Sequence, residues 1–400
     1  HLSPAAPVLD VERARALTPG CAQVIHLNHA GASLMPAPVL ETVVSHLRRE
    51  AEIGGYEAAD EAGDGLEAVY RSAARLLGAA RDEIALVENA TRAWDMAFYS
   101  FRFRPGDRIL IGRAEYVSNV IAELHVASRE GVVLEVVDDD EHGQLDVADL
   151  ERRLDDRVRL IALTHVPTNG GLVNPAADVG RVARAAGVPF LLDATQSAGQ
   201  MALDVAALGC DVLCLTGRKY LRGPRGTGIL YVRGELTGDL DPPFMEVRSA
   251  TWTAPDRYEV AAGARRFETW ERNVAGLLGL GAAIDHALGW GIEAIESRVT
   301  ALGEGLRGRL GTLDGVTIHD KGLRRCGIVT FTVDGVDASE VRRRLAAQRV
   351  NTVVSPLTSA QLDLPARGLG DLVRASVHYV NTEEELDRAA EAVASLARRS

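Results

Sequence analysis

Short apolar runs separated by helical patterns occupy the middle of the sequence and constrain the fold more than any other feature. They lie at 83–90, 107–116, 131–140, 157–166, 188–194, 211–217 and 226–232. Most are continuously apolar rather than alternating, which is typical of strands buried on both faces of a parallel sheet. The intervening segment PAADVGRVARAAG has small residues facing a sheet and ends at Gly187, a residue type that favours helix C-termini. The alternation predicts an α/β fold, with a large domain whose mostly parallel sheet lies between helices.

The pattern changes after about residue 285. A long charged helix over 290–313 is followed by strand-like VTIHD and GIVTFTVDG, a helix ASEVRRRLAAQ, and a last helix with Thr382 as its N-cap. These segments predict a smaller α+β domain. We therefore expect a large domain over residues 25–285, and a small domain formed by residues 1–24 together with 286–400.

Composition excludes several classes of function. The net charge of -12 and a pI near 5.4 argue against a protein that binds nucleic-acid phosphates. The longest apolar runs are too short to span a membrane. The cysteines at 21, 210, 214 and 326 have no metal-ligand spacing, and unpaired thiols fit a reducing compartment. We expect a soluble cytoplasmic protein with no metal site and no nucleic-acid or membrane partner.

Chemistry-bearing residues follow two of the apolar runs. Asp193 ends one run and Gln196 comes three residues later, while the next run ends at Thr216, ahead of Arg218 and Lys219. Open α/β sheets bind ligands at the carboxyl ends of their strands, and a lysine held there can lose its proton and act as a nucleophile. The alternative is that Asp193 caps a helix and Lys219 is a solvated loop cation.

Two more strand ends point to the same edge of the sheet. A helix begins near Ala90 and Thr91, and its first turn offers free backbone N–H groups to an anion. Tyr116 follows another strand, where its ring can stack on a flat heterocycle or simply pack at the rim of the core. The loop THVPTNGG ends a further strand and can face the same crevice.

The ordered motifs resemble a known family. ENATRAWD, AEYVSN, THVPTNGGLVNP, LLDATQSAGQ, TGRKYLRGPRGTGILYV, RRFETWERN and VRASVHYVNTEEELD are similar, from about residue 25 to 395, to class V aminotransferase-fold enzymes that use pyridoxal 5'-phosphate (PLP). That group of fold type I enzymes includes cysteine desulfurases, kynureninase, isopenicillin epimerase-like proteins and the carbon–sulfur lyase of ergothioneine biosynthesis. The motifs specify the fold and cofactor more closely than the reaction.

The resemblance implies a cofactor role for each matching residue. Lys219 is the catalytic residue that joins PLP covalently, Asp193 keeps the ring nitrogen protonated, and Gln196 hydrogen-bonds the ring's phenolic oxygen. Tyr116 takes the stacking position, which is histidine in the desulfurases. The residues implied to hold the phosphate are Ala90, Thr91, Thr216 and Arg218, the last of which stands where many relatives have histidine.

The same resemblance predicts the substrate side of the site. Arg374 matches the arginine that binds the α-carboxylate of an amino-acid substrate. The other residues expected near the substrate are Asn28, His29, Tyr56 and Thr168, with a structural hydrogen-bonding role as the alternative for His29. Relatives are homodimers in which the segment of RFETWERN reaches the neighbouring subunit's phosphate. We therefore expect a homodimer, with Arg272 as a candidate for that contact in place of the usual threonine.

A missing thiol guides the choice of reaction. Cysteine desulfurases need a nucleophilic cysteine on the loop before the carboxylate-binding arginine, and residues 355–374 contain none. The stretches EAEIGGYEAADEA and RKYLRGPRG also resemble the ergothioneine-pathway lyase. The sequence therefore predicts a PLP-dependent carbon–sulfur β-lyase that converts a cysteine S-conjugate or its sulfoxide into a thiol-type product, pyruvate and ammonia. A class V aminotransferase, an amino-acid epimerase and a non-catalytic scaffold are the alternatives.

Overall fold

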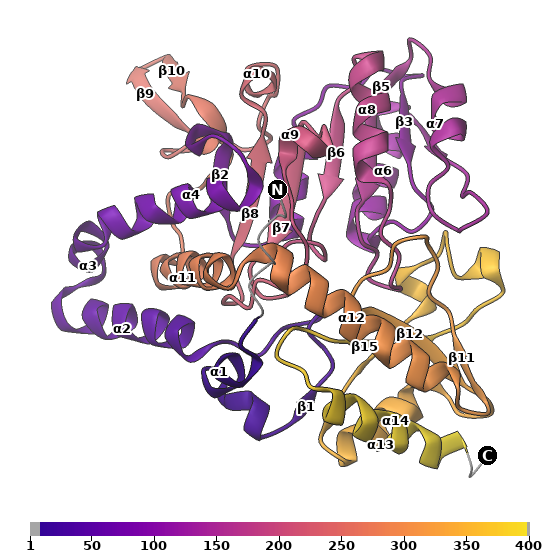
Figure 1. The fold of residues 1–400 in the computed structure, drawn as a ribbon. Helices are drawn as coiled ribbons and strands as arrows, with labels where there is room; N and C mark the ends of the chain where they lie inside the picture. Colours follow the sequence, from indigo (N-terminus) through magenta and orange to yellow (C-terminus); the bar gives the residue numbers. More distant parts are fainter. Residues whose placement is uncertain (1–8, 398–400) are drawn as a thin grey trace, which may run out of the picture.

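A seven-stranded sheet forms the centre of the computed structural model, which describes residues 9–397 (Figure 1). Its strands, in spatial order, are β2 (Ile84–Val87), β8 (Gly228–Val232), β7 (Val212–Thr216), β6 (Phe190–Asp193), β5 (Val158–Thr164), β3 (Arg108–Ile111) and β4 (Val133–Val136). From β7 to β4 all neighbours are parallel, whereas β8 is antiparallel to both β7 and β2. The predicted fold, a mostly parallel sheet flanked by helices, is confirmed.

Two apolar cores cover the two faces of this sheet. Along β6, Phe190 and Leu192 belong to one core and Leu191 to the other, as the two-residue period of a strand requires. The first core is completed by α4 (Gly63–Leu77), α8 (Ala176–Ala186) and α11 (Val274–Trp290), and the second by α5 (Ala90–Phe98) and α6 (Val117–Glu130). Burial on both faces explains why the strands read as continuous apolar runs. Shorter helices at the edges are α7 (Val147–Arg153), α9 (Val205–Leu208) and α10 (Gly234–Thr237).

A second, antiparallel sheet lies beside the first. Its order is β11 (Val316–Ile318), β12 (Ile328–Val333), β15 (Leu372–Ser376) and β14 (Val353–Ser355), and it packs with α12 (Ile292–Gly311), α13 (Ala338–Ala347) and α14 (Glu383–Ala397). At the start of α14, Thr382 Oγ1 accepts a hydrogen bond from Glu385 N at 3.2 Å. This α+β unit is the predicted small domain in outline.

The N-terminal segment crosses to this second sheet. After α1 (Val11–Ala16), strand β1 (Ile25–His26) pairs in parallel with β13 (Val350–Asn351), and Asn28 bridges to Ser376. Residues 25–28 therefore lie with the small sheet, although the predicted boundary assigns them to the large domain; the boundary itself stays a prediction. Residues 29–36 then lead from the small sheet into the helices that precede the first strand of the large sheet.

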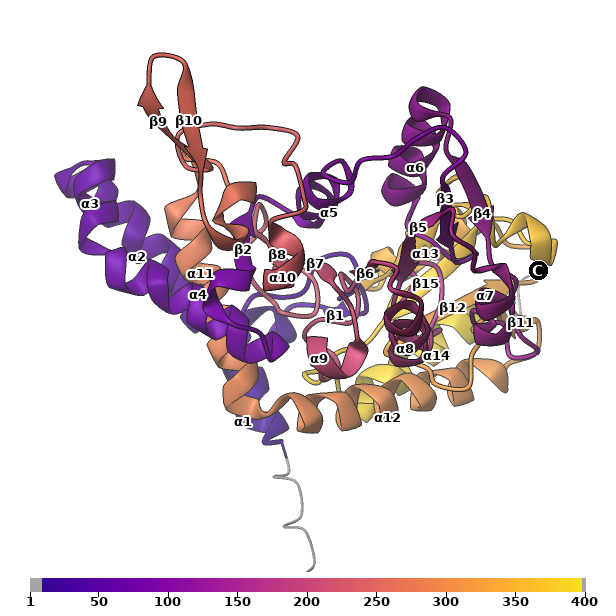
Figure 2. The ribbon, with the colours of Figure 1, turned by 90° about the horizontal axis from the view of Figure 1, so that it is seen from above.

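Two parts project from the body of the molecule. Helices α2 (Ala37–Ile53) and α3 (Gly55–Glu61) extend on one side, and the hairpin of β9 (Ala250–Ala254) and β10 (Arg257–Val260) stands out near them (Figure 2). Its cross-strand pair Trp252 and Tyr258 is 78% and 61% exposed. Within residues 9–397, no single helix is long and apolar enough to cross a membrane; α11 and α12 meet that length and composition only as a pair bent by 80°.

Candidate active site

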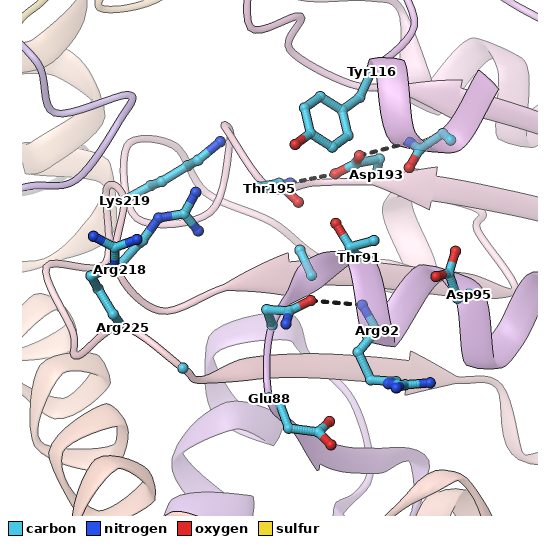
Figure 3. Close-up of a pocket in the computed structure, with 14 residues that line it drawn as sticks. Glu88, Thr91, Arg92, Asp95, Tyr116, Asp193, Thr195, Arg218, Lys219 and Arg225 are labelled. Atoms are coloured by element: carbon cyan, nitrogen blue, oxygen red, sulfur yellow. Dashed lines mark hydrogen bonds between the residues drawn. The ribbon is translucent and has the colours of Figure 1, made fainter. Parts of the chain in front are cut away.

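A pocket of about 490 Å³ opens at the carboxyl ends of the parallel strands, where α5 and α6 begin (Figure 3). Its wall includes six of the residues singled out from the sequence: Ala90, Thr91, Tyr116, Asp193, Arg218 and Lys219. They come from four separate stretches of the chain. The pocket is large enough for a small-molecule cofactor.

Lys219 is the reactive amine of the pocket. It is 6% exposed, and its Nζ lies 5.9 Å from the centre of the Tyr116 ring. Burial, with the nearby Arg374 and Arg218 cations, lowers the pKa of Lys219 to about 7, while Asp193 acts in the opposite direction. A substantial fraction of this amine is therefore unprotonated at neutral pH, which a nucleophilic lysine requires.

The chain offers one other lysine. Lys219 and Lys321 are the only lysines in the sequence. Lys321 lies outside the pocket, and its Nζ is 3.3 Å from Asp363 Oδ1 and 3.5 Å from Asp139 Oδ2. Both contacts hold the Lys321 side chain away from the pocket. A Schiff base with a lysine side chain therefore has one suitable position.

Asp193 is a buried carboxylate held by neutral donors. Its Oδ2 accepts a hydrogen bond from Asn119 Nδ2 at 2.9 Å, and its Oδ1 accepts one from Thr195 N at 2.9 Å. Among residues 9–397 it forms no ion pair, although it is only 3% exposed. Because a buried charge is costly without an opposite charge, this carboxylate fits a cationic ligand group such as a protonated pyridine nitrogen.

The start of α5 and Arg218 form the other end of the pocket. Asn89 Oδ1 accepts from Arg92 N at 2.8 Å and caps the helix, and first-turn N–H groups such as those of Ala90 and Thr91 have no acceptor within the helix. A Cβ on Gly228 would lie 2.6 Å from the Asn89 backbone, so glycine is required for strand β8 to pass this closely. Helix N–H groups opposite a guanidinium suit a phosphate.

Thr216 lies beneath this end rather than on the wall. Its hydroxyl donates to Thr227 O at 3.1 Å and accepts from Arg218 Nη1 at 3.3 Å. It therefore contacts the predicted phosphate ligand Arg218 directly.

A second group of predicted residues surrounds Arg374, the middle residue of β15. Arg374 Nη1 donates to Thr168 O at 3.0 Å and to Thr168 Oγ1 at 2.5 Å, and Nη2 donates to Asn28 Oδ1 at 3.4 Å. Gln196 Nε2 donates to Ala30 O and to Thr168 Oγ1. The structure thus brings Asn28, Thr168, Gln196 and Arg374 together.

Two buried atoms of this second group lack partners within residues 9–397. Arg374 Nε and Gln196 Oε1 have no hydrogen-bond partner in that part of the chain, and burial lowers the pKa of Arg374 to about 10 while leaving it cationic at neutral pH. Buried polar atoms in proteins are nearly always paired. A ligand carboxylate at Arg374 and a ligand hydroxyl at Gln196 would supply the missing partners.

Two predicted residues, His29 and Tyr56, lie apart from the pocket. His29 is fully buried between His26 and His378, with Nδ1 3.0 Å from Ser33 Oγ. Tyr56 is 70% exposed on α3, and its ring meets the Trp270 ring edge-on at 5.6 Å.

Arg272 is engaged within its own chain. Its Nη1 donates to the Tyr70 hydroxyl at 3.1 Å and lies 3.8 Å from Glu268 Oε2. Glu268 is buried and also binds Arg248, so one carboxylate is shared by two arginines. The predicted contact of Arg272 with a neighbouring subunit stays a prediction.

The sequence analysis missed two residues that shape the pocket. Asn119 fixes Asp193, and its position three residues after Tyr116 places it one turn further along α6. Glu115 is buried, and its carboxyl accepts from Thr164 Oγ1 at 2.5 Å, while Thr164 Oγ1 accepts from Tyr116 N at 3.1 Å. Burial raises the pKa of Glu115 to about 7. Helical spacing was the available signal for Asn119; for Glu115 none was available.

The groups around the pocket match those of a phosphorylated pyridine aldehyde. The helix N–H groups and Arg218 suit its phosphate, Asp193 suits its ring nitrogen, and Lys219 suits its aldehyde. Fold and pocket therefore define a PLP-dependent enzyme of fold type I. The chain belongs to the aminotransferase class V family, whose model matches residues 25–389.

Relatives within the family carry different activities. A probable hercynylcysteine sulfoxide lyase of Mycobacterium tuberculosis is 32% identical over 396 residues, covering 98% of this chain and 94% of the relative. A probable cysteine desulfurase of Methanothermobacter thermautotrophicus is 30% identical over 379 residues, covering 93% and 94%. Most of the named relatives carry the name cysteine desulfurase or probable cysteine desulfurase.

Solved structures superpose over nearly the whole chain. The apo cysteine desulfurase of Thermococcus onnurineus matches with a TM-score of 0.91 at 26% identity, covering 99% of this chain and 100% of that one. A cystine C–S lyase in complex with cysteine persulfide matches with a TM-score of 0.85 at 26% identity, covering 94% and 99%. The fold is thus shared by enzymes of both reaction types.

Proposed function

We propose that this class V enzyme is a carbon–sulfur β-lyase that cleaves a cysteine S-conjugate or its sulfoxide. The observation that carries the proposal is a site equipped to bind an amino acid and move its α-proton, on a chain with no cysteine in the loop before Arg374. Similarity to a sulfoxide lyase over 98% of the chain also supports it.

The four thiols of the chain are poorly suited to persulfide chemistry. Cys210, Cys214 and Cys326 are buried and Cys21 is half-buried. Burial raises the pKa of all four thiols. Because the thiolate is the nucleophile in sulfur transfer, the desulfurase activity named for many relatives is the weaker candidate.

Each of the following site residues has a proposed task. Arg374, with Thr168 and Asn28 beside it, binds the substrate α-carboxylate. Asp193 holds the proton on the cofactor's ring nitrogen, and Tyr116 stacks on the ring. Arg218, Ala90, Thr91 and Thr216 hold the phosphate, directly or through Arg218. When bound, PLP supplies an electron sink for the charge that develops at the substrate Cα.

Lys219 performs the proton transfer. With a substrate in the site, the unprotonated Nζ would accept the α-proton, and its lowered pKa suits a base working near neutral pH. The Cα–H electron pair forms a Cα–Cβ double bond as the Cβ–S bond breaks, and the sulfur fragment leaves with the Cβ–S pair. One water then hydrolyses the three-carbon fragment to pyruvate and ammonia, and the sulfur fragment gains a proton.

We further propose that the enzyme is a cytoplasmic homodimer. Unpaired cysteines support a reducing compartment. Exposed apolar side chains on α2, α3, the β9–β10 hairpin and the segment before α11 support a surface that a second copy covers: Leu40, Leu47, Tyr56, Trp252, Tyr258 and Trp270. Arg272 lies on the same side and is 20% exposed, so it remains our candidate for a contact across the interface.

Product analysis tests the lyase proposal. The holoenzyme is incubated with a panel of S-substituted L-cysteines and their sulfoxides, and pyruvate, ammonia and the sulfur fragment are measured together. Equal amounts of all three support the proposal. A keto acid that retains sulfur indicates an aminotransferase, an inverted amino acid indicates an epimerase, and alanine with persulfide from cysteine indicates a desulfurase.

A cysteine-free variant provides the matched control. Replacing Cys21, Cys210, Cys214 and Cys326 by alanine leaves the proposed lyase groups intact, so the folded variant still forms pyruvate. If the variant folds and binds PLP yet forms none, a thiol takes part and the proposal is wrong.

A further inference from the structure

Arg222 lies three residues after Lys219 and is unusual in three respects. It is 1% exposed, its backbone has φ +62° although it is not glycine, and its hydrogen-bond acceptors within residues 9–397 are all neutral. Burying a charge without a counter-charge is costly, and a left-handed backbone at a non-glycine residue adds strain. Such a residue persists only where the surrounding contacts compensate.

The guanidinium of Arg222 joins three parts of the chain. Nη2 donates to Thr18 Oγ1 at 2.6 Å, Nε donates to Leu34 O at 3.0 Å, and Nη1 donates to the Tyr379 hydroxyl at 2.6 Å. Its central carbon also lies 5.1 Å from the centre of the Tyr379 ring. The side chain therefore connects the Lys219 loop to the N-terminal segment and to a C-terminal segment, residues 372–381, that consists of β15 and the residues directly after it.

These two segments carry the groups proposed to bind the substrate carboxylate. Asn28 lies between Thr18 and Leu34 in the chain, and Arg374 lies five residues before Tyr379. The two segments also bind each other, because Ala30 N donates to Ser376 Oγ at 2.9 Å. Arg222 thus fixes the lysine loop against the pair of segments that holds Arg374 and Asn28.

Backbone contacts on either side of Lys219 reach the same two segments. Arg218 O accepts from Ser33 N at 2.9 Å, and Tyr220 O is hydrogen-bonded to His378 Nε2 at 2.7 Å. Each of these contacts reaches one segment, whereas Arg222 reaches both. Lysine at position 222 could not replace it, because an ammonium lacks the planar fork that serves three separate acceptors.

We infer that Arg222 is a positioning residue, which sets the place of the Lys219 amine relative to Arg374 by joining the lysine loop to both carboxylate-binding segments. The inference rests on the proposed roles of Lys219 and Arg374. It predicts that a variant without Arg222 still folds but binds amino acids more weakly than the wild type.

Arg298 offers a matched control. From α12 it donates to Tyr379 O at 2.7 Å and to Asn381 O at 2.6 Å, so it binds the same C-terminal segment, residues 372–381. It makes no contact with the lysine loop among its described hydrogen bonds. A purely structural role for Arg222 predicts the same consequences for both arginines.

Glycine binding to the holoenzyme tests the inference without depending on the reaction. The dissociation constant of glycine is measured from the change in cofactor absorbance, alongside thermal unfolding, for R222Q, R222K, Y379F and R298Q. We expect R222Q to raise the glycine Kd by roughly tenfold or more, R222K and Y379F to raise it by less, and R298Q to lower stability with the Kd near the wild-type value.

The double variant R222Q/Y379F sharpens the result. Because both substitutions break one link, we expect the double variant to bind glycine no more weakly than R222Q alone. An unchanged Kd in R222Q, or an equal rise in R298Q, overturns the inference. If R222Q does not fold, the glycine Kd of Y379F is compared with those of the wild type and R298Q instead, and an unchanged Kd overturns the inference. If the wild-type enzyme binds glycine but forms no pyruvate from any S-substituted cysteine or sulfoxide, the lyase proposal is overturned and the inference about Arg222 is not.

Discussion

Asn119 Nδ2 donates a hydrogen bond to Asp193 Oδ2 at 2.9 Å, while the other carboxylate oxygen accepts from the backbone of Thr195. The two donors belong to different elements, helix α6 and the turn after β6. Both carboxylate oxygens are thereby fixed, yet the carboxylate forms no ion pair within residues 9–397. An orientated but unpaired carboxylate is what a protonated ring nitrogen needs from its protein partner.

Asn119→Ala should weaken cofactor binding without abolishing it. Asp193 loses one charge-assisted hydrogen bond and with it the orientation of Oδ2. A bond to a charged group contributes about 1.5–3 kcal/mol, so we expect the PLP dissociation constant to rise roughly ten- to hundredfold. Titration of the apo protein with PLP measures this, and Ser118→Ala on the same helix is the control. Unchanged affinity would mean that Thr195 alone fixes Asp193.

Lys219→Ala should remove covalent attachment of PLP entirely. Borohydride reduction of the wild-type holoenzyme, followed by digestion and mass spectrometry, should place the pyridoxyl group on the peptide containing Lys219. We expect turnover in Lys219→Ala to fall by at least ~100-fold, since a positioned acid–base group contributes that much or more. Lys321→Ala removes the other lysine and should retain both the label and the activity.

The apo protein should become more stable, relative to Lys219→Met, as the pH rises from about 7 to about 9.5. The folded-state pKa of Lys219 is about 7, against an ordinary value of 10.5. Between these values the unfolded chain holds more protons at this position, so stability rises with pH; below about pH 7 the cost of burying the lysine is complete. The gain is up to about 3 kcal/mol. Urea denaturation of both apo proteins at the two pH values measures it, and parallel curves would contradict it.

The sheet was predictable because burial on both faces leaves a strong signal in the strands themselves. β6 and β7 appear as apolar runs, and the topology of an open sheet then brings Asp193 and Lys219 to one edge. The resemblance to the class V motifs predicted PLP as the cofactor. The structure brings together most of the residues predicted for the pocket because they follow these strands directly.

The remaining residues depend on loops whose course has no periodic signal. Tyr56 and Arg272 fall on segments whose positions are decided by packing against α4 and α11 rather than by strand order. His29 was expected near the substrate, with a structural role as the alternative, and only the folded chain reveals its buried neighbours His26 and His378. The acceptors of Arg222 are up to 204 residues away in sequence, which no local pattern can indicate.

Arg374→Gln should impair substrate binding and leave the cofactor in place. The substitution removes the cation proposed to bind the α-carboxylate but touches none of the residues that line the phosphate end of the pocket. We expect KM for the amino-acid substrate to rise by about 100-fold, within the range for a buried charge-assisted contact, with normal PLP content. Steady-state kinetics and the absorbance spectrum measure both quantities. Loss of PLP together with substrate binding would instead indicate a collapsed pocket.

Replacing the exposed aromatic pair of the β9–β10 hairpin should dissociate the proposed dimer. An isolated two-stranded hairpin is marginally stable in water, and this one carries Trp252 and Tyr258 on its exposed surface. Covering them in a second copy stabilises both the hairpin and the assembly. We expect Trp252→Ser/Tyr258→Ser to raise the dimer dissociation constant by at least ~10-fold, since each large aromatic contributes about 1.5–3 kcal/mol when buried.

Sedimentation velocity over a concentration series measures this dissociation constant. Leu323→Ser is the matched control, because Leu323 is 70% exposed but lies on the loop before β12, away from the hairpin. It should leave the assembly unchanged. A wild-type monomer, or a hairpin variant that dimerises as tightly as the wild type, would contradict the prediction. The first result would refute the homodimer itself, whereas the second would move the interface to α2, whose exposed Leu40 and Leu47 are then the next side chains to replace.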